Sequence, residues 1–392
     1  MNRNTKVLLT VSSFFGLGAG AYEFLLPYYL AERGISFAGM GLIFSLPAVG
    51  VLLLRPFLGG LSDAWGRKVF YAAGLAGTTV ANWATAFVAN VVPLTFLKAL
   101  RDTAVLTRDT MHPIVLWEDN RARFLDFVGK TRGAEFMLMG LGTIVAGYAA
   151  KEWGNPFGLQ LAAMICFVSL LLFLAGFREG ERHVSGDRPK GGHLLSLAME
   201  RNLLLIAASG FVFAAGLSTS HCFVMPLFFT RKFGSSESVV AWVMLLHRFT
   251  IGVPMLLVGQ LGLRHLKAAY ISTMVAEGLA LIGSVLAPSF LSSAFIWLLH
   301  DLIGAGIWQP IQYMIIQAYS NDATRGLEVG KVLTLAGLGG IIGPLVAGAL
   351  FGHWVNGPFL LSGVLMAASA VPLFGLRLER LSGIHKPALA VR

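Results

Sequence analysis

Residues 157–177 read FGLQLAAMICFVSLLLFLAGF, a stretch of 21 residues without a charged side chain. A helix needs about 20 such residues to cross a hydrocarbon core of ~30 Å. The rest of the 392-residue chain shares this character, since 56% of its residues are hydrophobic, 13% are charged and the mean hydropathy is +0.71. A soluble domain carries roughly twice that share of charge. We therefore predict an all-α integral membrane protein that crosses the membrane several times.

Twelve apolar spans can be distinguished along the chain, each about as long as this one. A polar link at 178–201 separates the first six spans from the last six. We predict an N-terminal six-helix bundle over 1–177, a cytoplasmic linker over 178–201 and a C-terminal six-helix bundle over 202–392. The spans lie at roughly 7–29, 38–60, 69–90, 92–116, 132–150, 157–177, 202–227, 237–259, 268–287, 290–316, 331–352 and 357–377.

The net charge of +10 follows the predicted topology. Of the 30 Lys and Arg residues, 21 fall in the termini and in the loops on the same side, whereas the opposite loops hold four: Arg33, Lys151, Arg231 and Lys232. Positively charged loops remain in the cytoplasm, so both termini are predicted to be cytoplasmic. The surplus of positive charge therefore requires no nucleic acid as a partner. Cys166 and Cys222 lie in apolar spans, without the spacing of a disulfide framework or a metal site.

The two halves of the chain repeat each other. Residues 96–102 read FLKALRD and residues 295–301 read FIWLLHD, an offset of 199 positions that also relates Pro27 to Pro226. His300 therefore takes the place of Arg101 in the second copy. Internal duplication is typical of secondary transporters, in which two pseudo-symmetric halves rock about a site near the middle of the membrane.

The loop after the second span carries a ten-residue motif. Residues 59–68 read GGLSDAWGRK, which resembles the cytoplasmic signature G-x-L-x-D-R-x-G-R-K/R of the major facilitator superfamily (MFS), except at Ala64. The second copy at 259–267, GQLGLRHLK, lacks the acid. Residues 339–348, GGIIGPLVAG, are similar to the antiporter motif of the proton–drug exchangers in this family.

The resemblance implies the twelve-helix fold of the family, in particular of its drug and metabolite exporters, and transport by alternating access. It also implies a monomer and a multi-pass protein of the cytoplasmic (inner) membrane. The acid of the motif can cap the start of a helix and pair with a basic residue across the interface of the two halves. The cytoplasmic gate would accordingly be formed by Gly59, Asp63, Gly66, Arg67 and Lys68.

The fourth span carries a stripe of polar side chains. At 100° per residue they fall within about 120° of arc, and a charge facing lipid costs at least ~2.5–3.5 kcal/mol. The stripe must therefore face a water-filled cavity or other helices. Adjacent residues diverge by about 100°, so neither Arg–Asp pair is expected to close on itself, and Glu23 and Glu135 are the predicted partners. The stripe consists of Lys98, Arg101, Asp102, Arg108, Asp109 and His112.

Two interpretations of this stripe stay open. In the first, its charges only hold the N-terminal bundle together. In the second, which we favour, it lines a cavity, and its buried acids exchange protons because burial favours their neutral form. For Glu135 alone we favour the structural role. Substrate contacts are then assigned to Arg101, Arg108 and His112, and proton coupling to Glu23, Asp102 and Asp109.

Imidazole side chains are frequent in the C-terminal half. A metal site with Cys222 or Met225 would suit them, but no two of these histidines are spaced i, i+4 on one helix, and we predict none. A proton relay or an anion contact is favoured, because histidine titrates near neutral pH. Glu277 and Arg55 are placed near helix ends, as packing or snorkelling residues. Substrate contacts are assigned to His221, His247, Arg248 and His300, and proton coupling to Asp301.

The chain is predicted to be a secondary active transporter of a small organic solute. Cations outnumber acids on the fourth span, which favours an anionic or zwitterionic solute, moved by proton-coupled efflux. The alternatives are a multidrug/proton antiporter for lipophilic cations, a lipid or lysolipid flippase of the same fold and, ranked lowest, a transporter of transition metals or metal chelates. An enzyme is not expected, because the sequence lacks nucleophile-elbow, phosphate-binding and paired-histidine motifs. The expected partners are the solute, protons and membrane lipid, with no cofactor.

Overall fold

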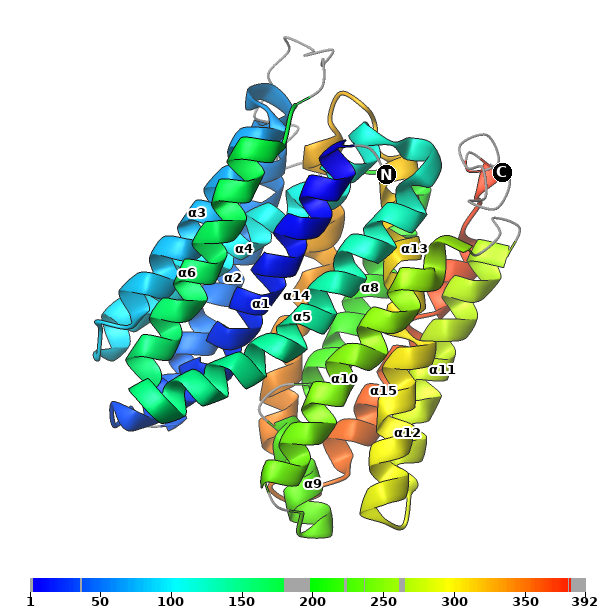
Figure 1. The fold of residues 1–392 in the computed structure, drawn as a ribbon. Coiled ribbons are helices and arrows are strands. Elements are labelled where there is room, and N and C mark those ends of the chain that lie inside the picture. Colours follow the sequence, from blue (N-terminus) through cyan, green and yellow to red (C-terminus); the bar gives the residue numbers. More distant parts are fainter. Residues whose placement is uncertain are drawn as a thin grey trace. The chain divides into compact units, whose positions relative to one another are not determined.

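The structure, a computed structural model, is built from helices (Figure 1). It describes residues 3–35, 37–179, 198–221, 224–235, 237–260, 265–379 and 381. No strand occurs within these ranges, as expected for an all-α protein. The α-helices are α1 (Arg3–Glu32), α2 (Phe37–Trp65), α3 (Arg67–Thr85), α4 (Val91–Asp119), α5 (Phe124–Trp153), α6 (Asn155–Gly176), α8 (Arg201–Ser220), α9 (Val224–Phe233), α10 (Glu237–Leu257), α11 (Leu266–Leu286), α12 (Phe290–Ile303), α13 (Ala305–Tyr319), α14 (Arg325–Phe351) and α15 (Gly357–Ala368). Short 3-10 helices are η1 (Arg121–Arg123), η2 (Val258–Gln260) and η4 (Val371–Gly375).

Nine stretches of the described chain are helical, long and apolar enough to cross a membrane. They correspond to the predicted first span and to the predicted fifth to twelfth spans. The predicted spans 38–60, 69–90 and 92–116 fall on α2, α3 and α4, which are helices of 29, 19 and 29 residues but are not among these nine. The prediction of a helical membrane protein is confirmed, while the count of twelve spans and the cytoplasmic termini stay predictions.

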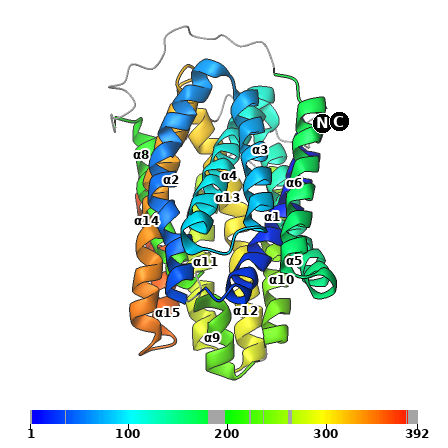
Figure 2. The same cartoon turned by 90° about the vertical axis from the view of Figure 1, so that its left-hand side faces the viewer.

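The first of two compact units consists of Met1–Arg121, Lys130–Ser196 and Asn321–Gly330. Within it, α4 packs against α2 and α3, while α6 packs against α1 and α3. Figure 1 and Figure 2 both show α3 and α6 side by side. Gly66 permits the sharp turn from α2 into α3, because its φ of 106° is one that residues with a side chain avoid. The helix that carries the charged stripe therefore has protein on more than one side, as its charges require.

The second unit consists of Ala122–Gly129, Leu197–Ser320 and Lys331–Arg392. Within it, α11 packs against α12, α13 and α15, α8 packs against α15, and α10 packs against α12 and α13. The helix α8 begins at a capped residue, since the Glu200 carboxylate accepts hydrogen bonds from the backbone N–H groups of Asn202 and Leu203. The predicted bundles over 1–177 and 202–392 and the linker between them stay predictions, because residues 180–197 lie outside the described chain.

Two spans that we predicted as continuous helices are interrupted. In the span 202–227, α8 ends at Ser220 and α9 begins at Val224. In the span 290–316, α12 ends at Ile303 and α13 begins after Gly304, whose φ of −113° and ψ of −106° are not helical. A Cβ atom at position 304 would lie 2.3 Å from the His300 carbonyl oxygen and 2.4 Å from Glu277 Oε2, so only glycine fits at this break.

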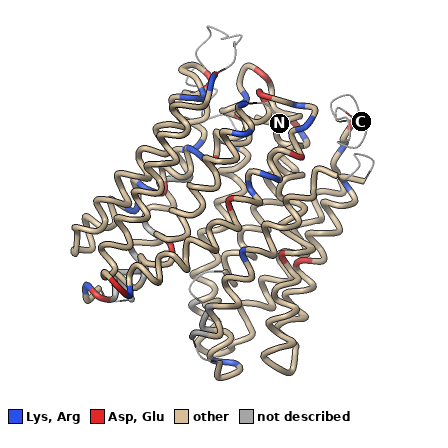
Figure 3. The backbone as a smooth tube through the Cα atoms, viewed as in Figure 1, with Lys and Arg blue, Asp and Glu red and all other residues tan. Residues whose placement is uncertain are grey.

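Charged side chains are sparse along the helices of both units, as Figure 3 shows. Those that do occur on α4, α10, α11 and α12 are therefore conspicuous, and they form the clusters described next. Three segments of interest lie outside the described residues: Cys222, the part of the second motif copy at 261–264, and most of the linker.

Candidate functional site

Arg101 on α4 is the centre of a charged cluster in the first unit. Its side chain is 4% exposed and lies with Nη2 3.5 Å from Glu23 Oε1 and Nη1 3.7 Å from Asp102 Oδ1. Its Nε donates a hydrogen bond of 3.1 Å to Asn82 Oδ1, and its guanidinium carbon lies 4.2 Å from the centre of the Tyr22 ring. The prediction that Glu23 is a partner of the stripe is confirmed.

Arg108 lies seven residues further along α4 and is fully buried. Its Nη1 donates to Glu135 Oε1 at 2.7 Å and to Asp109 Oδ1 at 2.8 Å, and its Nη2 donates to Ser12 Oγ at 2.7 Å. Arg132 shares both carboxylates, at 3.2 Å from Asp109 and 3.1 Å from Glu135. The predicted structural role of Glu135 agrees with this network of two cations and two anions, in which Glu135 and both arginines are buried while Asp109 is partly exposed.

The expectation that neighbouring Arg and Asp residues on α4 do not close on each other was wrong. Arg108 reaches Asp109 at 2.8 Å, and Arg101 approaches Asp102, because the long guanidinium side chain bends back along the helix surface. Asp102 also forms an ion pair with Lys98, one turn earlier. Every cation of the stripe is thus balanced by a carboxylate in the same unit.

His112 is buried with both ring nitrogens engaged. Its Nδ1 lies 3.0 Å from the Tyr71 hydroxyl and its Nε2 lies 2.8 Å from Thr131 Oγ1. A histidine with two partners and no exposure is suited to joining helices rather than to contacting a solute. The geometry therefore supports the structural interpretation for this residue, against our assignment to the substrate site.

The motif at residues 59–68 forms a latch on the start of α14, within the first unit. The Asp63 carboxylate accepts hydrogen bonds from the backbone N–H groups of Gly326 and Leu327, at 2.9 and 3.0 Å. The predicted helix cap is therefore present, and it caps α14. The ion pair that the structure shows for Asp63 is with Arg67 of its own motif, and the predicted pairing with a basic residue of the other half stays a prediction.

Arg67 holds the latch in place from the side of α3. Its Nη1 donates to Ser62 Oγ at 2.5 Å, its Nε donates to Glu118 Oε1 at 3.1 Å, and its backbone N–H donates to Glu179 Oε1 at 2.7 Å. The backbone N–H of Lys68 also points to this carboxylate, at 3.4 Å. The gate residues that we predicted thus act through a shared network, and their role in transport stays a prediction.

The loop before α14 is ordered by a second pair of charges. Asp322 contacts Arg325 and lies 2.9 Å from Arg121 Nη2. Partial burial acts to raise the pKa of Asp322, but Arg325 and then Arg121 outweigh it and lower the pKa below its ordinary value. The ionised form is therefore favoured on folding above the ordinary pKa, and this contribution is lost only as the pH falls through the lowered value.

Gly59 allows the close approach of α2 to the latch. A Cβ atom at this position would lie 2.0 Å from the Gly326 carbonyl oxygen. We expect Gly59→Ala to lower the stability of the protein by about 1–3 kcal/mol, as overpacking does, and to be visible as a lower midpoint of thermal unfolding in detergent. Gly50→Ala on the same helix is the matched control, because a Cβ there meets nothing within 4 Å. Equal midpoints for the two variants would contradict the close contact.

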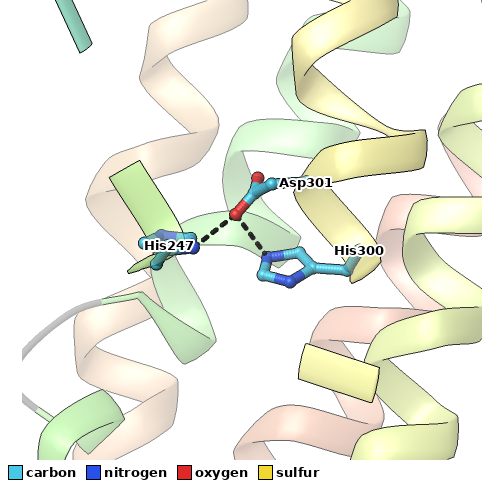
Figure 4. A group of neighbouring side chains, drawn as sticks. All are labelled: His247, His300 and Asp301. Carbon is cyan, nitrogen blue, oxygen red and sulfur yellow. Dashed lines mark ion pairs between the residues drawn. The ribbon is translucent and has the colours of Figure 1, made fainter. Parts of the chain in front are cut away.

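Three histidines and an aspartate gather in the second unit. His247 Nδ1 on α10 lies 2.5 Å from Asp301 Oδ2 on α12, and His300 Nε2 lies 3.3 Å from the same oxygen, as Figure 4 shows. His221, at the end of α8, places its Nε2 3.2 Å from His300 Nε2. The structure therefore brings together four of the five residues that we assigned in this half. The fifth, Arg248, is half-buried on α10, and its role stays a prediction.

The repeat of the sequence is visible in these contacts. Tyr22 and His221 are separated by the same 199 positions as Arg101 and His300. Tyr22 stacks on Arg101 in the first unit, and His221 contacts His300 in the second. Equivalent positions of the two units are therefore in contact, but the residues differ: a tyrosine and an arginine in the first unit, and two histidines in the second.

Glu277 does not lie near a helix end, where we had predicted it. It lies in the middle of α11 and is fully buried, where Oε2 accepts a hydrogen bond of 2.5 Å from Trp308 Nε1. The span predicted at 268–287 already put it at the centre of a helix, so the position along that span was the missed signal. Arg55 was likewise placed near a helix end, but its Nε donates to Thr110 Oγ1 on α4 at 3.1 Å.

Relatives and solved structures agree with this fold. The family model described as Major Facilitator Superfamily matches residues 8–101 and 206–389. The chain is 23% identical over 390 residues to Multidrug resistance protein 2 of Bacillus subtilis (strain 168), covering 93% of each chain. It is 24% identical over 381 residues to the class B tetracycline resistance protein of Escherichia coli, covering 90% of each chain.

Two solved transporters share the fold at low sequence identity. The human organic anion transporter MFSD10 (TETRAN) superposes with a TM-score of 0.74 at 16% identity, covering 95% of this chain and 99% of that one. The fucose:proton symporter FucP of Escherichia coli gives a TM-score of 0.75 at 12% identity, covering 94% and 97%. The match to the family model over most of the helices, together with this shared fold, shows that the chain belongs to the Major Facilitator Superfamily, as a multi-pass transporter of the cytoplasmic membrane.

Proposed function

We propose that this transporter exports a small organic solute in exchange for protons, and that the solute is zwitterionic or cationic. The sequence favoured an anionic or zwitterionic solute, because cations outnumber acids on the fourth span. Because those cations are buried in the structure, we now favour a zwitterionic or cationic solute over an anionic one. Glu23, Asp102 and Asp109 are the proposed proton-linked acids.

The proposal rests on a difference in exposure: two acidic side chains near α4 are partly exposed, whereas the two arginines beside them are buried. The side chains of Glu23 and Asp109 are 44% and 31% exposed, whereas those of Arg101 and Arg108 are 4% and 0% exposed. A carboxylate in mid-membrane is too costly to face hydrocarbon, so these acids face a polar space. A solute that enters this space meets carboxylates first, and a positively charged group is attracted to them.

The names of the relatives bear on the export of an organic solute and on its coupling to protons. Two of them are multidrug and tetracycline resistance proteins, which supports export of an organic solute. One structural neighbour is a proton symporter, which supports proton coupling. The other neighbour is an organic anion transporter, so an anionic solute is retained as a competing outcome of the test. The remaining alternatives are a lysolipid flippase and, ranked lowest, a transporter of transition metals or metal chelates.

The test is transport by the purified protein in liposomes across an imposed pH gradient. Ethidium serves as the cation, tetracycline as the zwitterion, fluorescein as the anion and a fluorescent lysolipid as the fourth probe. We expect the gradient to drive ethidium or tetracycline and neither of the other two. Transport of fluorescein or the lysolipid alone, or transport that ignores the gradient, would overturn the proposal.

Glu23→Gln is expected to reduce gradient-driven transport about tenfold or more, because it removes a charged partner of Arg101. Glu32→Gln is the matched control on the same helix, since Glu32 is exposed and accepts a hydrogen bond from Asn155 at 2.7 Å. Flux is measured from the initial rate of probe movement at equal amounts of inserted protein. Equal rates for the two variants would remove Glu23 from the coupling mechanism.

A further inference from the structure

We propose that the second unit binds a divalent transition-metal ion of the Zn²⁺ type, held by His221, His247, His300 and Asp301. The sequence predicted no metal site, because these histidines share no helix at i, i+4 spacing. The structure supplies them instead from α8, α10 and α12. This inference goes beyond the proposed function, whose proton-linked acids are Glu23, Asp102 and Asp109 of the first unit, and it gives the histidines and Asp301 a role other than the one that the sequence suggested.

The spacing of the donor atoms is the first argument. A tetrahedral ion with ligands at ~2.0–2.1 Å holds its donor atoms about 3.3 Å apart. His221 Nε2 and His300 Nε2 are 3.2 Å apart, and His300 Nε2 and Asp301 Oδ2 are 3.3 Å apart. The donor atoms of His247, His300 and Asp301 all lie within 4.8 Å of one another. His247 Nδ1 points at the same Asp301 oxygen from 2.5 Å, so these two atoms must move apart to share an ion (Figure 4).

The three imidazole rings lie at similar distances from one another. Their centroids are 5.2 Å apart for His221 and His300, 5.4 Å for His247 and His300, and 5.7 Å for His221 and His247. Three histidines that share one tetrahedral ion have centroids roughly 5 Å apart, given a metal–nitrogen distance near 2 Å. The rings therefore need only small movements to bind one ion together.

The outer ring nitrogens are held as they are in metal sites. A ligating histidine usually donates its other N–H to a backbone carbonyl, a hydroxyl or a carboxylate, which fixes the tautomer and aims the free nitrogen at the ion. His300 Nδ1 contacts the Trp297 carbonyl oxygen, and His221 Nδ1 lies 2.8 Å from Ser220 Oγ. Both side chains thus present Nε2 to the centre of the cluster.

The charge of the cluster also calls for a cation. Asp301 is buried, and the ion pairs that the described residues form with it come from the two imidazoles of His247 and His300. A buried carboxylate is stable only with a compensating positive charge. A bound divalent ion supplies this charge directly. The competing explanation is a chain of hydrogen bonds between neutral or protonated imidazoles without any metal.

The position in the fold favours ion binding. His221 follows the last residue of α8, and His300 and Asp301 lie in the last turn of α12, just before the break at Gly304. Ion sites in transporters are commonly formed where a membrane helix is interrupted. Imidazole with one carboxylate suits borderline transition metals such as Zn²⁺ and Co²⁺, whereas Mg²⁺ and Ca²⁺ prefer oxygen ligands.

The test uses the full chain, purified in detergent through a tag without histidines. Co²⁺ is titrated into the protein, and the visible absorption that marks tetrahedral coordination is followed. We expect one Co²⁺ per chain, its displacement by Zn²⁺, and a higher midpoint of thermal unfolding with Zn²⁺ but not with Mg²⁺. A spectrum of hydrated Co²⁺ only, with no shift by Zn²⁺, would overturn the metal site and leave the hydrogen-bonded chain.

Single-residue variants assign the ligands. His247→Asn and Asp301→Asn are each expected to weaken Co²⁺ binding by about tenfold or more, while His353→Asn, at an exposed histidine of the same unit, keeps it. Retained tetrahedral binding in both site variants would place the ion elsewhere and contradict the proposal. If one variant does not fold, the other and the spectrum of the parent protein decide. The solute assay above is independent, so either proposal can fail alone.

Discussion

Arg101→Ala is expected to reduce coupled transport by about tenfold or more while leaving the protein inserted in the membrane. The guanidinium contacts Glu23, Asp102 and Asn82 and stacks on Tyr22. Without it, Glu23 loses the guanidinium that lies 3.5 Å away, so the charged cluster that we propose for coupling is broken. Hydrogen bonds to charged groups contribute about 1.5–3 kcal/mol, which corresponds to roughly 10–150-fold in rate. Flux in liposomes is the measurement, with the amount of inserted protein as the reference.

The conservative variant separates charge from shape. Arg101→Lys keeps the positive charge but loses the planar group that bonds to Asn82 and stacks on Tyr22. We expect it to retain a fraction of the transport rate, above that of the alanine variant and below that of the parent. Full transport by Arg101→Ala would show that this guanidinium has no part in the mechanism.

Arg108→Ala is expected to have the largest effect on stability. Breaking a buried ion pair by removing one partner costs about 3–5 kcal/mol. We expect a value near ~3 kcal/mol, because Arg132 remains next to both Asp109 and Glu135. The midpoint of thermal unfolding in detergent measures it. Arg121→Ala is the comparison, since both side chains of its pair with Asp322 are exposed and such pairs contribute little.

A double variant distinguishes lost pairing from lost packing. Replacing a complete buried pair by apolar residues is often neutral, so Arg108→Leu with Glu135→Leu should recover most of the stability that Arg108→Ala loses. A double variant as unstable as the single one would mean that the packing of this side chain on Phe15, at 4.2 Å, matters more than its charge.

The general architecture was predictable because membrane spans are long and nearly free of charge, so composition alone identifies most of them. The partners of α4 were predictable for a related reason. Few acids exist within the spans of the N-terminal half, and a buried cation needs one of them. Glu23 and Glu135 followed from this scarcity, and the structure places both against arginines of α4.

The predictions that were wrong concern features that depend on side-chain length and on tertiary contacts. The direction of the Cα–Cβ bonds suggested that Arg108 and Asp109 diverge, but the guanidinium is long enough to return to its neighbour. The break at Gly304 is marked in the sequence by that single glycine, and α8 ends at Ser220 with neither glycine nor proline next to it. The histidine cluster was assigned residue by residue, yet its convergence requires three helices, which no spacing along the sequence reveals.

The way in which Asp63 holds α14 has a consequence for how this protein tolerates mutation. The carboxylate binds backbone N–H groups, which every residue except proline offers, and no side chain of the receiving helix takes part in these bonds. The identity of Leu327 is therefore of little importance to the latch, whereas Asp63 has no substitute with two ionised oxygens at the same reach. Substitutions at Leu327 should therefore leave the two hydrogen bonds intact, whereas a side chain at Gly326, whose Cβ would lie 2.3 Å from the Gly59 carbonyl oxygen, or the loss of the Asp63 carboxylate should break them.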